Sequence, residues 1–115
     1  MMELSFSGFG ENAATFLAQE GVAPGMPVKI TANGTVGPCA ADDDFCGAAL
    51  SVRGGYAAVQ LCGYARLPYD GEAPAAGWRA LSAAGDGKIK AAASGGRVLL
   101  VLDVDETEKT CGVIL

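Results

Sequence analysis

Apolar and polar residues alternate in short runs along most of the chain, and turn-forming residues separate the runs. A period of two places successive side chains on opposite faces of a half-buried strand. Beyond residue 20 no stretch shows the longer period of an amphipathic helix. The pattern predicts two short strands within residues 28–36 and further strands over residues 47–52, 56–67, 78–82, 88–92, 98–104 and 110–115.

Turn signals lie at short intervals between these runs. The dipeptides Asn33-Gly34 and Asp86-Gly87 supply the positive φ angles that a two-residue hairpin turn requires. Many short strands with closely spaced turns are typical of β-sandwiches and small barrels. The sequence therefore predicts an all-β fold, a small barrel or sandwich of eight to ten short strands.

The N-terminal segment is set apart by a stretch with two glycines and two prolines over residues 21–27, which predicts a hinge. Before it, residues 2–17 favour one or two short strands or an extended arm. A short helix over residues 12–20, capped by Asn12, is the alternative. We therefore expect an N-terminal arm, residues 1–20, and a single β domain, residues 21–115.

The two halves of the domain share an order of features. Each has an Ala-x-Gly segment, a hairpin turn, a short strand and a Cys-Gly-x-x-Leu segment. This order predicts two related hairpin units, residues 25–50 and 77–115, in which Cys46 lies over Cys111 and the two hairpin turns coincide. Chance similarity between glycine-rich hairpins is the alternative.

Composition limits the classes of function. The chain has 115 residues, which fits one domain, with 8 basic and 13 acidic residues and no histidine. Nucleic-acid binding is disfavoured, because affinity for phosphates comes from lysine and arginine. Without histidine the chain lacks the commonest general base and most catalytic zinc sites. We expect no enzyme, no catalytic residue and no cofactor.

Membrane and metal sites are not expected either. The longest aliphatic run, residues 98–102, is far shorter than the about 20 residues that cross a bilayer. The N-terminus lacks the basic flank and apolar core of an export signal, so the cysteines at 39, 46, 62 and 111 are expected to be reduced, structural thiols. Their spacing does not suit zinc. The run Asp42-Asp43-Asp44 lacks the spaced ligands of a calcium loop and is expected to be a solvated acidic loop.

The aromatic residues suggest contact surfaces. Trp78 follows a loop and opens a strand, which favours a core anchor over an exposed platform. The arm is apolar, and an exposed apolar segment marks a contact surface. Candidates for contact with a second copy or a larger partner are therefore Phe6, Phe9, Phe16, Tyr69 and Trp78.

Three segments carry a resemblance to a known family: residues 63–69 (Gly-Tyr-Ala-Arg-Leu-Pro-Tyr), 76–78 (Ala-Gly-Trp) and 111–115 (Cys-Gly-Val-Ile-Leu). The sequence resembles the small capsid decoration, or cement, proteins of tailed bacteriophages and prophages. That family has a Gly-Val-Ala-Leu-like strand, a Gly-x-x-x-x-Pro stretch and a late Gly-Val-Ala-like strand. Residues 47–50, 63–68 and 112–115 fill these places, and the resemblance covers about residues 23–115.

The resemblance implies a non-enzymatic β-barrel that is made in the bacterial cytoplasm, binds the outside of a phage head and reinforces it in the virion. Its partner would be the major capsid protein, and it would form a homo-oligomer, commonly a trimer. The alternative is a β-sandwich ligand- or carbohydrate-binding module, with exposed aromatic side chains from Tyr56, Tyr64, Tyr69 and Trp78. A metal-dependent enzyme is a third class, and elemental analysis tests it.

Overall fold

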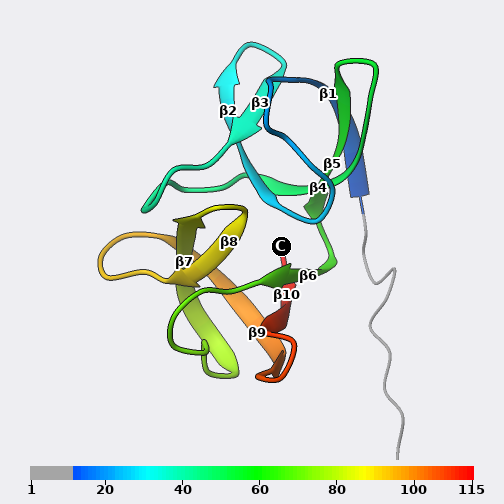
Figure 1. The fold of residues 1–115 in the computed structure, drawn as a ribbon. Coiled ribbons are helices and arrows are strands. Elements are labelled where there is room, and N and C mark those ends of the chain that lie inside the picture. Colours follow the sequence, from blue (N-terminus) through cyan, green and yellow to red (C-terminus); the bar gives the residue numbers. More distant parts are fainter. Residues whose placement is uncertain (1–11) are drawn as a thin grey trace, which may run out of the picture.

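The computed structural model describes residues 12–115, which form ten strands and no helix (Figure 1). The all-β prediction is confirmed. The strands are β1 (Asn12–Ala18), β2 (Pro27–Ala32), β3 (Thr35–Pro38), β4 (Gly47–Arg53), β5 (Tyr56–Cys62), β6 (Tyr64–Pro68), β7 (Gly77–Gly85), β8 (Lys88–Ala91), β9 (Arg97–Asp105) and β10 (Thr110–Ile114).

The strands form two sheets that follow each other along the chain and are stacked end to end (Figure 1). The first five close into a barrel in the order β1-β3-β2-β4-β5, in which β1 is parallel to β3 and antiparallel to β5. The last five form a sheet in the order β6-β10-β9-β7-β8. A single parallel bridge from Tyr69 to Ile89 links the end of β6 to β8.

The two sheets have the same topology. When β1 to β5 are matched to β6 to β10 in order, four of the five neighbouring pairs in the barrel correspond to neighbours in the second sheet, and the fifth, β1–β3, corresponds to the two edge strands β6 and β8. The orientations agree as well, since the parallel pair β1–β3 corresponds to the parallel Tyr69–Ile89 bridge and the other pairs are antiparallel. We call residues 12–62 the N-terminal unit and residues 64–114 the C-terminal unit. The prediction of two related units is confirmed, but the predicted bounds, residues 25–50 and 77–115, are wrong, because each unit also includes the strands β1 and β5 or their counterparts β6 and β10.

The register of the hairpins agrees residue by residue. Ile30 pairs with Val36 in the first hairpin, and Ala83 pairs with Ile89 in the second, so the counterpart of each residue lies 53 positions later. Both hairpins have a register shift directly after this pair. A second shift lies at Leu50 in β4 and at Leu102 in β9, which the pairing with β5 and with β10 passes over. Shared irregularities of this kind indicate one structural unit that occurs twice.

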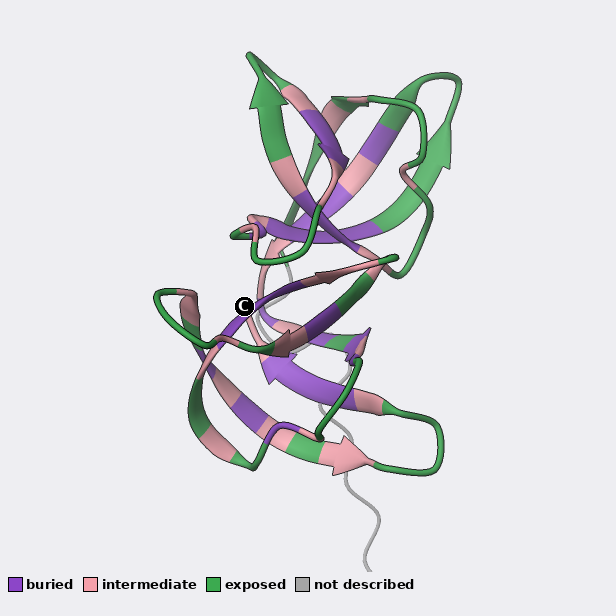
Figure 2. Ribbon diagram, turned by 60° about the vertical axis from the view of Figure 1, so that its left-hand side comes forward, coloured by how far each residue is buried: buried purple, intermediate pink, exposed green. Residues whose placement is uncertain are grey.

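The buried side chains of the N-terminal unit have buried counterparts in the C-terminal unit. Figure 2 shows that the tips of the hairpins far from the junction are exposed. Alternation along each strand places these side chains inside. The core of the first unit is Val28, Val36, Ala49, Ala57 and Val59, and the matching residues of the second are Leu81, Ile89, Val101, Cys111 and Val113.

The predicted alignment of the two cysteines is wrong. Cys111 lies on β10, where its counterpart is Ala57 of β5, whereas Cys46 directly precedes β4, whose counterpart is β9. The repeated Cys-Gly-x-x-Leu letters therefore fall on strands that are not equivalent. Hairpin turns and bulges set the register of the repeat, and a short glycine-rich match does not.

Part of the expected N-terminal arm is a strand of the barrel. Residues 12–18 form β1, which pairs with β5 along its whole length, so the strand alternative is confirmed there and the helix alternative is wrong. Phe16 is half-buried against the core of the N-terminal unit. Phe6 and Phe9 lie outside the described residues. The predicted strand over residues 56–67 is in fact two, β5 and β6, which meet at Gly63 with φ 91°.

Candidate interaction surfaces

The loop of residues 39–46, between β3 and β4, joins the two units. The Asp42 amide donates a hydrogen bond to the Ala83 carbonyl at 2.8 Å, and the Ala83 amide donates to the Asp43 carbonyl at 2.9 Å. Since β9 pairs with β7 only up to Leu81, the loop occupies the side of β7 that β9 leaves open. It acts as a short added strand, and Figure 1 shows it reaching towards β7 and β8.

Side chains at both ends of this loop are fixed to the C-terminal unit. Phe45 is 2% exposed and belongs to the core cluster of that unit, and Cys39 packs against the same cluster. The Arg97 guanidinium donates to the Cys46 carbonyl at 3.0 Å. The N-terminal unit thus supplies a large apolar side chain to the core of its neighbour.

Two ion pairs hold the acidic run in place. Lys29 lies 2.6 Å from Asp43 within the N-terminal unit, and Lys90 of β8 lies 2.6 Å from Asp42. The Asp43 carboxylate also accepts the Ala40 amide at 2.8 Å. The hydrogen bond from Lys29 lowers the pKa of the Asp43 carboxyl, and the same bond raises the pKa of Lys29. The expectation of a solvated acidic loop is confirmed for Asp42 and Asp44, which are exposed, whereas Asp43 is half-buried.

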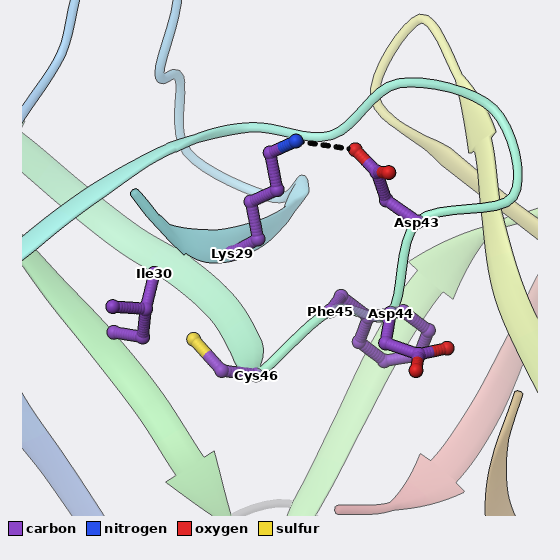
Figure 3. Close-up of a pocket in the computed structure, with 6 residues that line it drawn as sticks. All are labelled: Lys29, Ile30, Asp43, Asp44, Phe45 and Cys46. Atoms are coloured by element: carbon purple, nitrogen blue, oxygen red, sulfur yellow. Dashed lines mark hydrogen bonds and ion pairs between the residues drawn. The ribbon is translucent and has the colours of Figure 1, made fainter. Parts of the chain in front are cut away.

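A hollow of about 450 Å³ lies beside the loop, on the N-terminal unit (Figure 3). Ile30 on one wall is 52% exposed, and the Lys29–Asp43 ion pair lies across the hollow from it in this view. The lining combines apolar and acidic side chains, which are Lys29, Ile30, Asp43, Asp44, Phe45 and Cys46.

The backbone of β2 is open at this hollow. The Val28 carbonyl accepts the Cys46 amide at 2.8 Å, which places the Val28 backbone groups on the β4 side. Backbone groups alternate sides along a strand, so those of Ile30 face the same side. Within residues 12–115, β4 pairs with β2 only at Pro27 and Val28. The edge at Ile30 is therefore the counterpart of the edge at Ala83, but no described residue covers it.

A second exposed apolar surface, which we call the β7–β9 face, lies on the C-terminal unit. Trp78 is 66% exposed and is paired with Leu100 of β9, so the two side chains share one face. Val98, which is 61% exposed, lies on that face as well because it is two residues from Leu100. The prediction of Trp78 as a core anchor is wrong. Leu99 and Val101 are buried, so Leu100 between them points to the opposite face of β9. Trp78 is paired with Leu100 and points to that outer face as well.

A third surface lies on the barrel. Leu17 of β1 pairs with Tyr56 of β5, and both are exposed, as is Val52 of β4. The hollow next to them contains Val52 and Tyr56 together with Thr15 and Arg53. It shares no lining residue with the hollow at Ile30.

The aromatic side chains proposed for ligand contact differ in their exposure. Tyr69 is buried in the core of the C-terminal unit, where Lys109 Nζ lies 5.6 Å from the centre of its ring. Tyr64 is half-buried, and its hydroxyl accepts a hydrogen bond from Arg66 at 3.0 Å. Tyr56 and Trp78 are exposed but lie on different units. The aromatic side chains therefore do not form one continuous platform.

The cysteine thiols lie in partly or fully buried positions. Cys111 is buried and the other three are half-buried. Burial raises the pKa of both Cys39 and Cys111 to about 11, and it raises the pKa of Cys46 too. A thiol of high pKa stays protonated at neutral pH and is a weak nucleophile. No group of three or more Cys, Asp or Glu side chains suited to a metal ion occurs within residues 12–115.

Comparison of the chain with protein-family models and with curated proteins gave no match. In the part of the chain that the structure describes, no helix is long and apolar enough to cross a membrane.

Proposed function

We propose that this protein is a non-enzymatic structural protein, a decoration protein that binds the outside of a phage head and stabilises it in the virion. The observation that carries the proposal is the β7–β9 face. Trp78 and Val98 leave a large apolar surface in water, which is a mark of a contact site. Tryptophan is also enriched among the residues that contribute most to binding. The resemblance of residues 23–115 to decoration proteins supplies the kind of partner.

The partner would be the major capsid protein, and copies of the chain would form a homo-oligomer, with a trimer favoured. A rigid β fold suits this role, because a reinforcing protein must keep its shape while it holds its neighbours. Two units joined by a hydrogen-bonded loop and a shared core residue meet that need.

Co-sedimentation with purified phage heads tests the proposal. We expect the wild type to bind and Trp78→Ala to weaken binding at least about tenfold, since a buried aromatic anchor of an interface is commonly worth more than about 1.4 kcal/mol. Tyr56→Ala is the matched control, because it removes an exposed aromatic ring from the other unit. Absence of binding by the wild type, or equal loss in both variants, would contradict the proposed role of the β7–β9 face.

A carbohydrate-binding module is the second candidate, because two aromatic rings, Tyr56 and Trp78, are exposed and could stack on sugars. Pull-down on insoluble polysaccharides separates the two functions. Retention on a polysaccharide that is lost in either aromatic variant would favour the module over the decoration protein.

A further inference from the structure

The contact between the two units is one-sided. The N-terminal unit supplies the loop of residues 39–46, and the C-terminal unit supplies the β7 edge at Ala83. Each unit also has the counterpart of the feature that the other unit uses in this contact. The N-terminal unit has an uncovered β2 edge at Ile30, and the C-terminal unit has the loop between β8 and β9, residues 92–96.

The two loops share one backbone feature, although the loop of residues 92–96 is shorter than the loop of residues 39–46. Asp42 has φ 71° and Gly95, which lies at the same distance from the preceding strand, has φ 63°, so each loop turns through a left-handed residue there. In the first loop this turn presents the Asp42 amide to Ala83. In the second loop Ala93, Ser94 and Gly95 are exposed. The backbone groups that correspond to those of Asp42 are therefore accessible.

The residues that follow the loops correspond as well. In the N-terminal unit, Cys46 is half-buried and Ala48 is buried in the core of the neighbouring unit, and their counterparts lie 52 positions later in the register that Leu50 and Leu102 set. In the C-terminal unit the loop is followed by Val98, which is 61% exposed, and by Leu100, which is half-buried. The surface that makes the internal contact in one unit is thus an exposed apolar surface in the other.

We propose that copies of the chain associate head to tail through a repetition of the internal contact. Residues 93–96 of one copy pair with the β2 edge at Ile30 of the next, and Val98 of the first copy enters the hollow beside Ile30. The proposal rests on the self-association proposed above, but not on binding to a capsid. Because the contact joins two different surfaces, it closes into a ring or continues as an open chain.

The charges of the two surfaces are complementary. The hollow at Ile30 is lined by Asp43 and Asp44 with Lys29 as its only base. Of the four basic residues within residues 77–98, Lys90 and Arg97 already bind Asp42 and the Cys46 carbonyl within the chain, and Arg79 and Lys88 remain against a single acidic residue, Asp86. Opposite charges favour the approach of one copy to another, and salt screens this attraction. We therefore expect association to weaken as the ionic strength rises.

Sedimentation velocity with the full chain tests the inference. We expect the wild type to form species larger than a monomer, and Ile30→Lys and Val98→Lys each to weaken association at least about tenfold. Val52→Lys is the control, since it places the same charge at an exposed apolar residue of the same barrel in another hollow. It should associate like the wild type.

Mixing the two defective variants gives a sharper result. Each keeps one intact surface, so Ile30→Lys and Val98→Lys together should form a one-to-one dimer and nothing larger. Circular dichroism checks the fold of each variant, and Ile30→Thr and Val98→Thr replace any lysine variant that unfolds. A mixture that stays monomeric, or an Ile30 variant that associates like the wild type, would overturn the contact.

A monomeric wild type would overturn it too. If Ile30→Lys then lowers the thermal stability of that monomer, Ile30 makes its contacts within one chain. Head binding is measured separately. A monomer that still binds heads would refute the head-to-tail contact and leave the capsid role intact.

Discussion

The N-terminal unit is a closed barrel with a small core, whereas the C-terminal unit has the same strand order but is open between β6 and β8. Val28 and Val36 of the first core correspond to the larger Leu81 and Ile89 of the second. In the first unit, two residue pairs between β1 and β3 close the sheet, whereas in the second a single bridge links the end of β6 to β8 and the sheet stays open. The same strand order thus surrounds smaller side chains in the closed unit and larger ones in the open unit.

The two cores also differ in where their residues come from. Every member of the first cluster lies within residues 16–61, inside the N-terminal unit. The second cluster includes Phe45 and Ala48, which belong to the N-terminal unit. The C-terminal unit therefore depends on its neighbour for part of its core, and the reverse does not hold. This asymmetry indicates that the N-terminal unit is the more self-sufficient of the two.

Replacement of Phe45 is the strongest test of this asymmetry. Phe45→Ala removes a side chain that is 2% exposed, so we expect unfolding to become easier by about 3–5 kcal/mol in chemical denaturation. Hydrogen exchange should show the loss of protection mainly in β7 to β10. Phe16→Ala is the control, because Phe16 is only half-buried and packs in the N-terminal unit. Equal loss of protection in both units would contradict the dependence.

Equivalent core positions provide a second, smaller test. Leu81→Ala should cost about 2–5 kcal/mol, because it removes a fully buried side chain and leaves a cavity. Val28→Ala at the matching position removes one carbon fewer, and each buried methylene contributes roughly 0.8 kcal/mol. Denaturant titration of the two variants compares the cores directly. A larger loss for Val28→Ala would show that the smaller core is the more tightly packed.

Local features of the fold could be predicted from the sequence. The two-residue turns at Asn33-Gly34 and Asp86-Gly87 and the strand over residues 98–104 follow from dipeptide chemistry and alternation, and the structure has them. Both residues of the second turn have the predicted positive φ, whereas in the first turn only Gly34 does. The parallel pairing of β1 with β3 could not be predicted, since it joins residues that are distant in sequence and leaves no local signal. The predicted alignment of the two units was wrong for a similar reason. Bulges at Leu50 and Leu102 set the register of the repeat, and they leave no local signal in the sequence.

The candidate surfaces could be predicted only in part. Trp78 was among the predicted contact residues, but its exposure depends on which face of β7 points outward, and that follows from the pairing with β9. The hollow at Ile30 was missed. The signal that could have pointed to it is Lys29, the only basic residue among the first 50, in the same half as the acidic run. A lone base within an acidic half favours an ion pair that fixes a loop.

Acidification gives the smallest expected effect, because the Lys29–Asp43 pair is partly exposed to solvent. Lys29 lowers the pKa of Asp43 in the folded protein below its ordinary value of 3.8. A lowered carboxyl pKa stabilises the fold fully above the unfolded pKa, and this contribution is lost as the pH falls through the folded pKa. We therefore expect Asp43→Asn to be less stable than the wild type at neutral pH, with a difference that shrinks once the pH drops below about 3.8.

Asp44→Asn is the control, because Asp44 makes no ion pair with any residue from 12 to 115. Thermal unfolding of the three proteins across acidic pH measures the difference. A gap between Asp43→Asn and wild type that stays constant through this range would mean that the Lys29–Asp43 pair does not hold the joining loop. The link between the units would then rest on Phe45, the Ala83 hydrogen bonds, the Lys90–Asp42 pair and the Arg97 hydrogen bond.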